Sequence, residues 1–283
     1  MTGQAHQSRV LRSLQVSDKI CLAELTAEEA RTALADNPVI ILPLGSHEDQ
    51  GPHAPMGDYL CADAIARRVA QAARARGIGT YVAPVLPYGG ADYFGSVVGG
   101  IALEQATLRA VLTDMMSCLL RHDLTRIIVF NGHGGNAQAV HDVTLSLRHR
   151  HGVVIPCVYL WSIASAMLAD VMGDADAARR SAGHGGNPLS SVAMALFPEL
   201  VRPDLRPAPA CAHEFMGLPV NGFATAQFEG ASINFPLEID EIATRGVAQA
   251  DPRLCDATTG QALVDRLTTL GADLVVHLMK ENW

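Results

Sequence analysis

Residues 39–66 read VIILPLGSHEDQGPHAPMGDYLCADAIA, and this stretch decides the fold. Its first six residues are apolar and the run stops at Gly45, which is typical of a buried strand. Ligands of open α/β sheets bind beyond the carboxyl ends of strands, so the residues that follow form a candidate site. Carboxylates and imidazoles, which suit a divalent cation, crowd there. The polar residues are His47, Glu48, Asp49, Gln50, His53 and Asp58.

Composition excludes several classes of protein. The 283 residues can bury a sizeable core, and 49% hydrophobic with 18% charged residues is ordinary for a globular protein. A net charge of −8 without a Lys/Arg-rich stretch argues against a nucleic-acid partner. No apolar run reaches the length of about 18 residues that a transmembrane helix requires, and the N-terminus lacks the apolar region of a secretory signal. The six cysteines are scattered without a CxxC pair, which favours buried thiols in a reducing cytoplasm.

Strands and helices alternate along the chain. Apolar runs predict strands at 39–44, 80–85, 126–130 and 153–160. A capping box of Thr26 and Glu29 predicts the start of a first helix. Amphipathic spacing predicts further helices at 58–77, 103–122, 137–149, 188–198 and 258–280. This alternation predicts an α/β fold with a mostly parallel sheet that helices cover on both faces.

We expect a single domain over residues 1–283. Residues 1–20 are polar and predict an N-terminal arm. Residues 203–245 are punctuated by Pro, Gly and Asn, which predicts irregular strands or a cap over the site. No internal repeat or low-complexity segment is visible in the sequence.

Glu48, Asp58 and His133 are the strongest candidate metal ligands. The loop between the two carboxylates is too rich in Gly and Pro to be helical, so the chain can fold both back on one point. His133 lies in the loop NGHGGN, 131–136, at the carboxyl end of another predicted strand, and these ends share one edge of a parallel sheet. Three protein ligands leave a coordination position open for water or substrate, as hydrolytic metals require.

These residues also have structural interpretations. Asp58 precedes a helix and could be only its N-cap, and His133 could be a turn histidine bonded to the backbone. A purely structural role is harder to assign to Glu48, because a buried loop carboxylate needs a partner. His184, in GHGGNP, could be a turn residue or a second catalytic imidazole. The glycines after His133 could cradle a phosphate, but GxxxxGK[ST], GxGxxG and the serine-hydrolase GxSxG are all missing from the sequence.

Residues 43–58, PLGSHEDQGPHAPMGD, resemble the creatininase family of metal-dependent amidohydrolases, whose pattern is roughly P-x-G-S-x-E-Q-H-G-P-H-L-P-L-x-T-D. Further segments resemble that family in the same order. They are Pro87-Tyr88-Gly89, the loop NGHGGN at 131–136, His184-Gly185-Gly186 and GVAQADPRLCDATTG at 246–260. The resemblance therefore covers residues 39–270, which is nearly the whole chain.

The resemblance implies a three-layer α/β/α fold, a site at the strand carboxyl ends and assembly into a homo-oligomer, commonly a hexamer. It implies one or two divalent metal ions per chain, which could be Zn, Mn or Fe. The implied ligands are Glu48, Asp58 and His133, and Asp58 would bridge the ions if two bind. Other roles follow from position in the family pattern. We expect catalysis by His184 and Glu48, substrate binding by Tyr88, Asn136 and His53, and weak metal ligation by Gln50.

The chain also departs from the family pattern. Gln50 replaces a ligand histidine, and an amide is a much weaker ligand than an imidazole. The loop from His53 to Asp58 is one residue shorter. Three further family positions, a histidine and two glutamates, are Phe94, Leu189 and Gly135 in this chain. The first metal site therefore keeps its expected ligands, whereas the second lacks some of the family's ligands. This difference makes creatinine a poor candidate substrate.

We therefore expect a hydrolase that opens a C–N amide bond of a small molecule, such as a cyclic amide or a formamide, with metal-activated water. Two alternatives remain open. The chain could use one metal as a Lewis acid for another reaction, such as C–C or C–O cleavage or an isomerisation. It could also be a non-catalytic binding subunit that has lost its second metal. The expected partners are a small-molecule substrate and further copies of the chain, not nucleic acid or a membrane.

Overall fold

The computed structural model describes residues 18–90, 97–209, 213–243, 245–281 and 283. Most of the predicted N-terminal arm, Phe94 and Cys211 lie outside these residues. Within them, no helix is long and apolar enough to span a bilayer.

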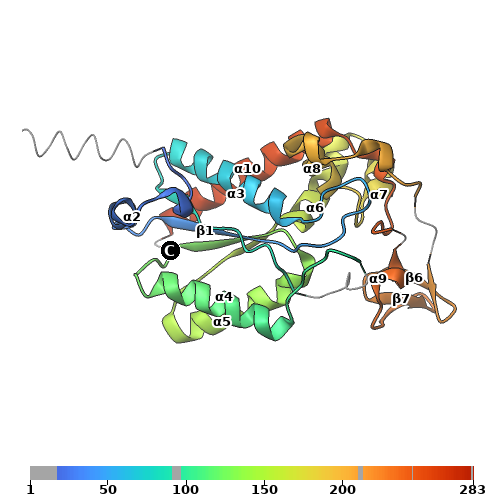
Figure 1. Cartoon of the computed structure of the whole chain (residues 1–283), viewed down its shortest axis with the longest axis horizontal. Helices are drawn as coiled ribbons and strands as arrows, with labels where there is room; N and C mark the ends of the chain where they lie inside the picture. The colour runs from blue at the N-terminus through green and yellow to red at the C-terminus, as the bar shows by residue number, and fades with distance from the viewer. Residues whose placement is uncertain (1–17, 91–96, 210–212, 244, 282) are drawn as a thin grey trace, which may run out of the picture.

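A four-stranded parallel sheet forms the centre of the molecule (Figure 1). In spatial order its strands are β2 (Thr80–Val82), β1 (Val39–Leu44), β3 (Ile127–Asn131) and β4 (Cys157–Tyr159). The predicted strands at 80–85 and 153–160 are too long. Proline has no N–H to donate to a ladder, and Pro84 follows β2 closely while Pro156 directly precedes β4.

Helices cover both faces of the sheet, which confirms the three-layer α/β/α fold (Figure 1). Alternate strand residues point to opposite faces. Ile41 and Phe130 pack against α3 (Tyr59–Ala75), α6 (Leu160–Met172), α8 (Leu189–Leu196) and α10 (Ala257–Lys280). Ile40 and Val129 pack on the other face, against α4 (Gln105–Leu120) and α5 (Ala137–His151).

Two helices, α6 and α7 (Ala175–Ser181), occupy a segment for which the sequence predicted no helix. Gly173, at φ 65°, ends α6 in the left-handed region that favours glycine. The next residue, Asp174, then caps α7, because its side chain accepts from the N–H groups of Asp176 and Ala177. The remaining short elements are α2 (Ala27–Ala33), α9 (Ile239–Ile242) and 3₁₀ turns at Leu22–Glu24, Gly134–Asn136, Pro198–Leu200, Pro203–Leu205 and Pro252–Leu254.

A second, antiparallel sheet lies inside the region 203–245, for which the sequence predicted irregular strands or a cap. Its strands are β5 (Glu214–Phe215), β6 (Leu218–Gly222), β7 (Thr225–Phe228) and β8 (Ala231–Asn234), paired in that order. It lies with α9 at one end of the α/β/α body, on the right in Figure 1. A small apolar cluster that includes Leu237 and Ile239 packs with Phe215 and Val220 of this sheet.

The cysteines only partly match the expectation of buried thiols. Cys21, Cys61 and Cys255 are buried, whereas Cys118 and Cys157 are exposed. All five are free thiols. Burial raises the pKa of the Cys61 thiol, which keeps it protonated and unreactive.

Candidate metal centre

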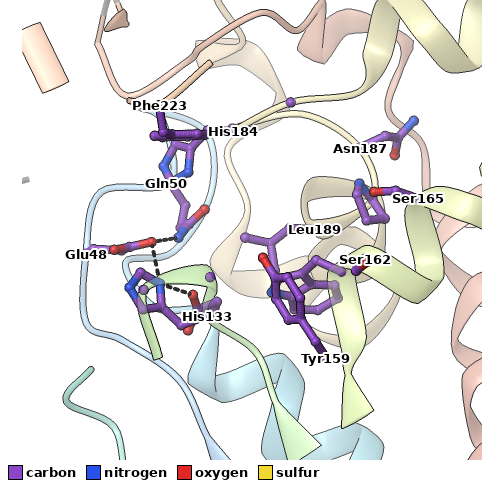
Figure 2. Close-up of a pocket in the computed structure, with 17 residues that line it drawn as sticks. Glu48, Gln50, His133, Tyr159, Ser162, Ser165, His184, Asn187, Leu189 and Phe223 are labelled. Atoms are coloured by element: carbon purple, nitrogen blue, oxygen red, sulfur yellow. Dashed lines mark hydrogen bonds and ion pairs between the residues drawn. The ribbon is translucent and has the colours of Figure 1, made fainter. Parts of the chain in front are cut away.

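Three predicted ligands converge where the central strands end. Glu48 follows β1, Asp58 directly precedes α3, and His133 follows β3. Each side chain offers one ligand atom, and these atoms all lie within 4.8 Å of one another. The three residues are 5%, 2% and 5% exposed, so they meet in a site that is largely shielded from water. Figure 2 shows Glu48 and His133 facing each other across this cluster.

The imidazole of His133 is oriented as in a metal ligand. Its Nε2 lies 3.0 Å from the carbonyl oxygen of Gly90, to which it donates. Its Nδ1 lies 3.1 Å from Asp58 Oδ2 and 3.2 Å from Glu48 Oε1. Histidine ligands commonly donate their second N–H to a backbone carbonyl, which leaves the other nitrogen for the ion. Two carboxylates and one imidazole are donors that suit a divalent cation.

Asp58 occupies the N-cap position of α3, but its carboxylate does not cap the helix. Instead, Oδ1 accepts a 2.6 Å hydrogen bond from the Ser46 N–H, and Oδ2 faces His133. Gly45 permits this approach, because a Cβ at that position would lie 2.4 Å from Asp58 Oδ1. The interpretation of Asp58 as only a helix cap is therefore wrong.

The cluster holds a proton near neutral pH. Burial raises the pKa of Asp58 to about 7, although the hydrogen bond from His133 opposes this shift. Burial alone would lower the pKa of His133, but the charge of Glu48 and the bonds to both carboxylates outweigh it and raise that pKa well above its usual value. A divalent cation would supply the positive charge in place of this proton.

Gln50 contacts the cluster through its amide. Its Nε2 donates to Glu48 Oε1 at 2.9 Å, while its Oε1 is buried without a hydrogen-bond partner among the described residues. His184 lies nearby, where its Nε2 donates to the Asp49 carbonyl at 2.6 Å and its ring meets Phe223 edge-on at 5.7 Å (Figure 2). In the neutral imidazole the proton is therefore on Nε2.

The three predicted substrate-binding residues do not line the pocket beside the cluster. His53 is 1% exposed, and its Nε2 bonds Ser190 Oγ at 3.1 Å. Asn136 is fully buried, where it accepts from the Gly90 N–H and donates to the Gly45 carbonyl. Their contacts brace the loops around the pocket, and substrate binding by these residues stays a prediction. Tyr88 is 38% exposed and also lies outside the lining.

A cavity of about 450 Å³ opens beside the cluster. Sequence reasoning missed several of its lining residues. Tyr159 and Trp161 could have been found, because Tyr159 ends β4 and Trp161 follows it closely, at the same sheet edge that carries Glu48 and His133. The indole N–H of Trp161 donates to the Gly132 carbonyl, next to His133. The other missed lining residues are Ser162, Ser165, Asn187 and Phe223.

Fold and site together define a three-layer α/β protein with a candidate divalent-metal centre at the carboxyl edge of its sheet. The chain belongs to the creatininase family, because the family model described as creatinine amidohydrolase matches residues 23–275. This match confirms the resemblance in the sequence motifs.

Two of the relatives that the chain resembles carry different names. The creatinine amidohydrolase of Pseudomonas putida is 30% identical over 204 residues, which is 66% of this chain and 75% of that protein. A mycofactocin precursor peptide peptidase from Mycobacterium ulcerans is 29% identical over 189 residues, 65% of this chain and 68% of that protein. Among solved structures, one described as creatininase Mn has a TM-score of 0.67 and 22% identity, covering 91% of this chain and 97% of that one. This last similarity supports the shared fold.

Proposed function

We propose that the protein is a metal-dependent amidohydrolase that cleaves a C–N amide bond of a small molecule, such as a cyclic amide or a formamide. The observation that carries this proposal is the convergence of Glu48, Asp58 and His133 within 4.8 Å in a buried site beside a cavity. These three residues would hold the ion. A divalent ion bound there would polarise the amide carbonyl and acidify a water molecule.

Other residues of the chain would orient the substrate and move protons. His184 carries its proton on Nε2, held by the Asp49 carbonyl, so Nδ1 is the nitrogen that would exchange a proton with the leaving amine. The pKa of Tyr159 is raised to about 12 by burial and by the charges of Asp58 and Glu48, so its hydroxyl stays protonated as a hydrogen-bond donor. Trp161, Leu189 and Phe223 add apolar surface that excludes water from the cavity.

We expect about one divalent ion per chain rather than two. Gln50 presents an amide, which is a poor ligand for a second ion. Asp58 already uses Oδ1 to accept from the Ser46 N–H, which limits its capacity to bridge two ions. Elemental analysis of protein purified without added metal or chelator measures this number. A value near two would show that other residues complete a second site.

Product analysis tests the reaction. We expect protein loaded with Zn²⁺ or Mn²⁺ to convert at least one member of a panel of cyclic amides, formamides and short peptides into an amine and a carboxylate, detected by mass spectrometry. The relative named as a peptide peptidase favours peptides as a second candidate substrate class. No turnover with any divalent ion would contradict the proposal and favour a binding subunit. Products that do not arise from hydrolysis would favour another Lewis-acid reaction.

Assembly into a homo-oligomer, with a hexamer as the common family form, and a cytoplasmic location both remain predictions from the sequence, as does the single domain.

A further inference from the structure

Two amide oxygens of the pocket lack a hydrogen-bond donor. Gln50 Oε1 and Asn187 Oδ1 are both buried, and neither has a partner within the described part of the chain. The residues are 2% and 0% exposed, yet both line the pocket. Buried acceptors are nearly always paired, because leaving one unpaired costs free energy. Two unpaired acceptors in one pocket point to a ligand that supplies the donors.

The orientation of the Gln50 amide follows from its neighbour. Its Nε2 lies 2.9 Å from Glu48 Oε1, and an ionised carboxylate can only accept hydrogen bonds. The NH₂ group must therefore face Glu48. The amide oxygen is then directed away from Glu48, toward the interior of the pocket (Figure 2).

The orientation of the Asn187 amide is determined by Ser181. The Ser181 hydroxyl donates to the Ala178 carbonyl at 3.0 Å, so it can only accept from Asn187. Asn187 Nδ2 makes that bond, also at 3.0 Å, which leaves Oδ1 on the other side of the amide. The backbone of Asn187 is held as well, since its N–H donates to the Ser181 carbonyl and its carbonyl accepts from the Gly183 N–H. Figure 2 shows Asn187 across the pocket from Gln50.

The rest of the pocket also favours a ligand that donates hydrogen bonds. None of the lining residues in the described part of the chain is Lys or Arg, and the proposed ion would offset the charges of Glu48 and Asp58. Trp161, Leu189 and Phe223 supply apolar surface. A neutral compound with N–H groups and an apolar body matches these properties, whereas a carboxylate at either amide oxygen would be repelled.

We propose that Gln50 and Asn187 determine specificity by each accepting a hydrogen bond from an N–H or O–H group of the substrate. Because Gln50 is bonded to a ligand of the proposed metal ion, it would bind the donor beside the scissile carbonyl. Asn187 would bind a donor on the far side of the same molecule. The substrate is then an amide with donors at both ends, such as a ureide or an amide that carries an amino, hydroxyl or guanidino group at its far end. This assignment rests on the proposed function for the position of the scissile bond.

4-Aminobenzamide and 4-methylacetophenone are suitable probes, because they share a ring and a carbonyl and differ in NH₂ against CH₃ at both ends. We expect Zn²⁺-loaded protein to bind 4-aminobenzamide roughly ten- to a hundredfold more tightly than 4-methylacetophenone, as measured by calorimetry. Gln50→Met and Asn187→Leu should each reduce this ratio, and the double variant should bring it to about one. The affinity for 4-methylacetophenone, measured at saturating Zn²⁺ because Gln50 supports a ligand of the proposed ion, shows whether the pocket is intact in each variant.

Several outcomes would overturn the proposal. Equal affinities in the wild type would mean that water satisfies the two amide oxygens, and an undiminished ratio in the double variant would place recognition elsewhere. If Gln50→Met reduced the affinity ratio and Asn187→Leu did not, Asn187 would be removed from the proposal. If Asn187→Leu does not fold, Asn187→Ser provides a smaller side chain without the amide oxygen. The affinity ratio does not depend on turnover. If the wild-type protein showed the expected ratio but hydrolysed no amide, the result would contradict the proposed function but not this inference.

Discussion

Replacing His133 with alanine is expected to abolish metal binding and, with it, the hydrolysis of amides. The change removes the imidazole that faces Glu48 and Asp58 and, among the described residues, leaves two buried carboxylates without their cationic partner. Loss of residues that merely support a ligand lowers metal affinity about 10–100-fold, so loss of the ligand itself should cost roughly a hundredfold or more. Elemental analysis of the purified variant and product formation by the metal-supplemented variant measure the two effects.

Two comparison variants make this result interpretable. Glu48→Gln preserves the shape of the side chain but removes its charge, and we expect it also to lose metal. His141→Ala removes an exposed histidine from α5 and should leave metal content and activity at wild-type levels. Full metal content and full activity in both His133→Ala and Glu48→Gln would refute the proposed metal centre.

Gly260→Ala is expected to destabilise the protein severely. Gly260 lies in α10, where an added Cβ would stand 1.8 Å from the backbone oxygen of Ser191 in α8. Relative to glycine, alanine stabilises a helix by about 1 kcal/mol. This gain is outweighed because the two helices must separate to admit the methyl group. We expect a net loss of about 3 kcal/mol in the free energy of unfolding, or a melting temperature lower by roughly 6 °C or more, measured by thermal denaturation.

Gly271→Ala is the matched control, because it makes the same change in the same helix. Its Cβ would lie 2.7 Å from a methyl group of Val69, rather than 1.8 Å from a backbone oxygen. The loss in stability should therefore be clearly smaller than for Gly260→Ala. Thr258→Ala, at an exposed position of α10, should have almost no effect. An unchanged melting temperature for Gly260→Ala would contradict the close packing of α8 on α10.

Local sequence patterns predicted the central layers of the fold well. The strands β1 and β3 are continuous apolar runs because helices bury both of their faces, and such runs are visible without a structure. For the antiparallel sheet the sequence predicted only irregular strands or a cap, because few of its residues are buried and the strand bounds leave little pattern. All four residues of β8, for example, are exposed, so no alternation of apolar and polar residues marks the strand.

The candidate site was only partly accessible to sequence reasoning. Glu48, Asp58 and His133 could be grouped because strand carboxyl ends share one sheet edge and because the family pattern contains them. Asn187 and Phe223 line the pocket from segments far along the chain. Local sequence patterns do not predict how these segments pack against the rest of the protein. Substrate binding by His53 and Asn136 stays a prediction, and the contacts that bury both residues could not be read from their positions in a motif.

The position of Trp161 gives the protein an internal optical reporter. The chain contains two tryptophans, and the second, Trp283, donates its indole N–H to the Val154 carbonyl and does not line the pocket. Trp161 stands in the pocket wall with its indole anchored beside His133. Trp283→Phe would therefore leave Trp161 as the single tryptophan, and its emission would respond to the polarity of the cavity. Metal loading and compound binding could then be followed by spectroscopy in solution before any substrate is known.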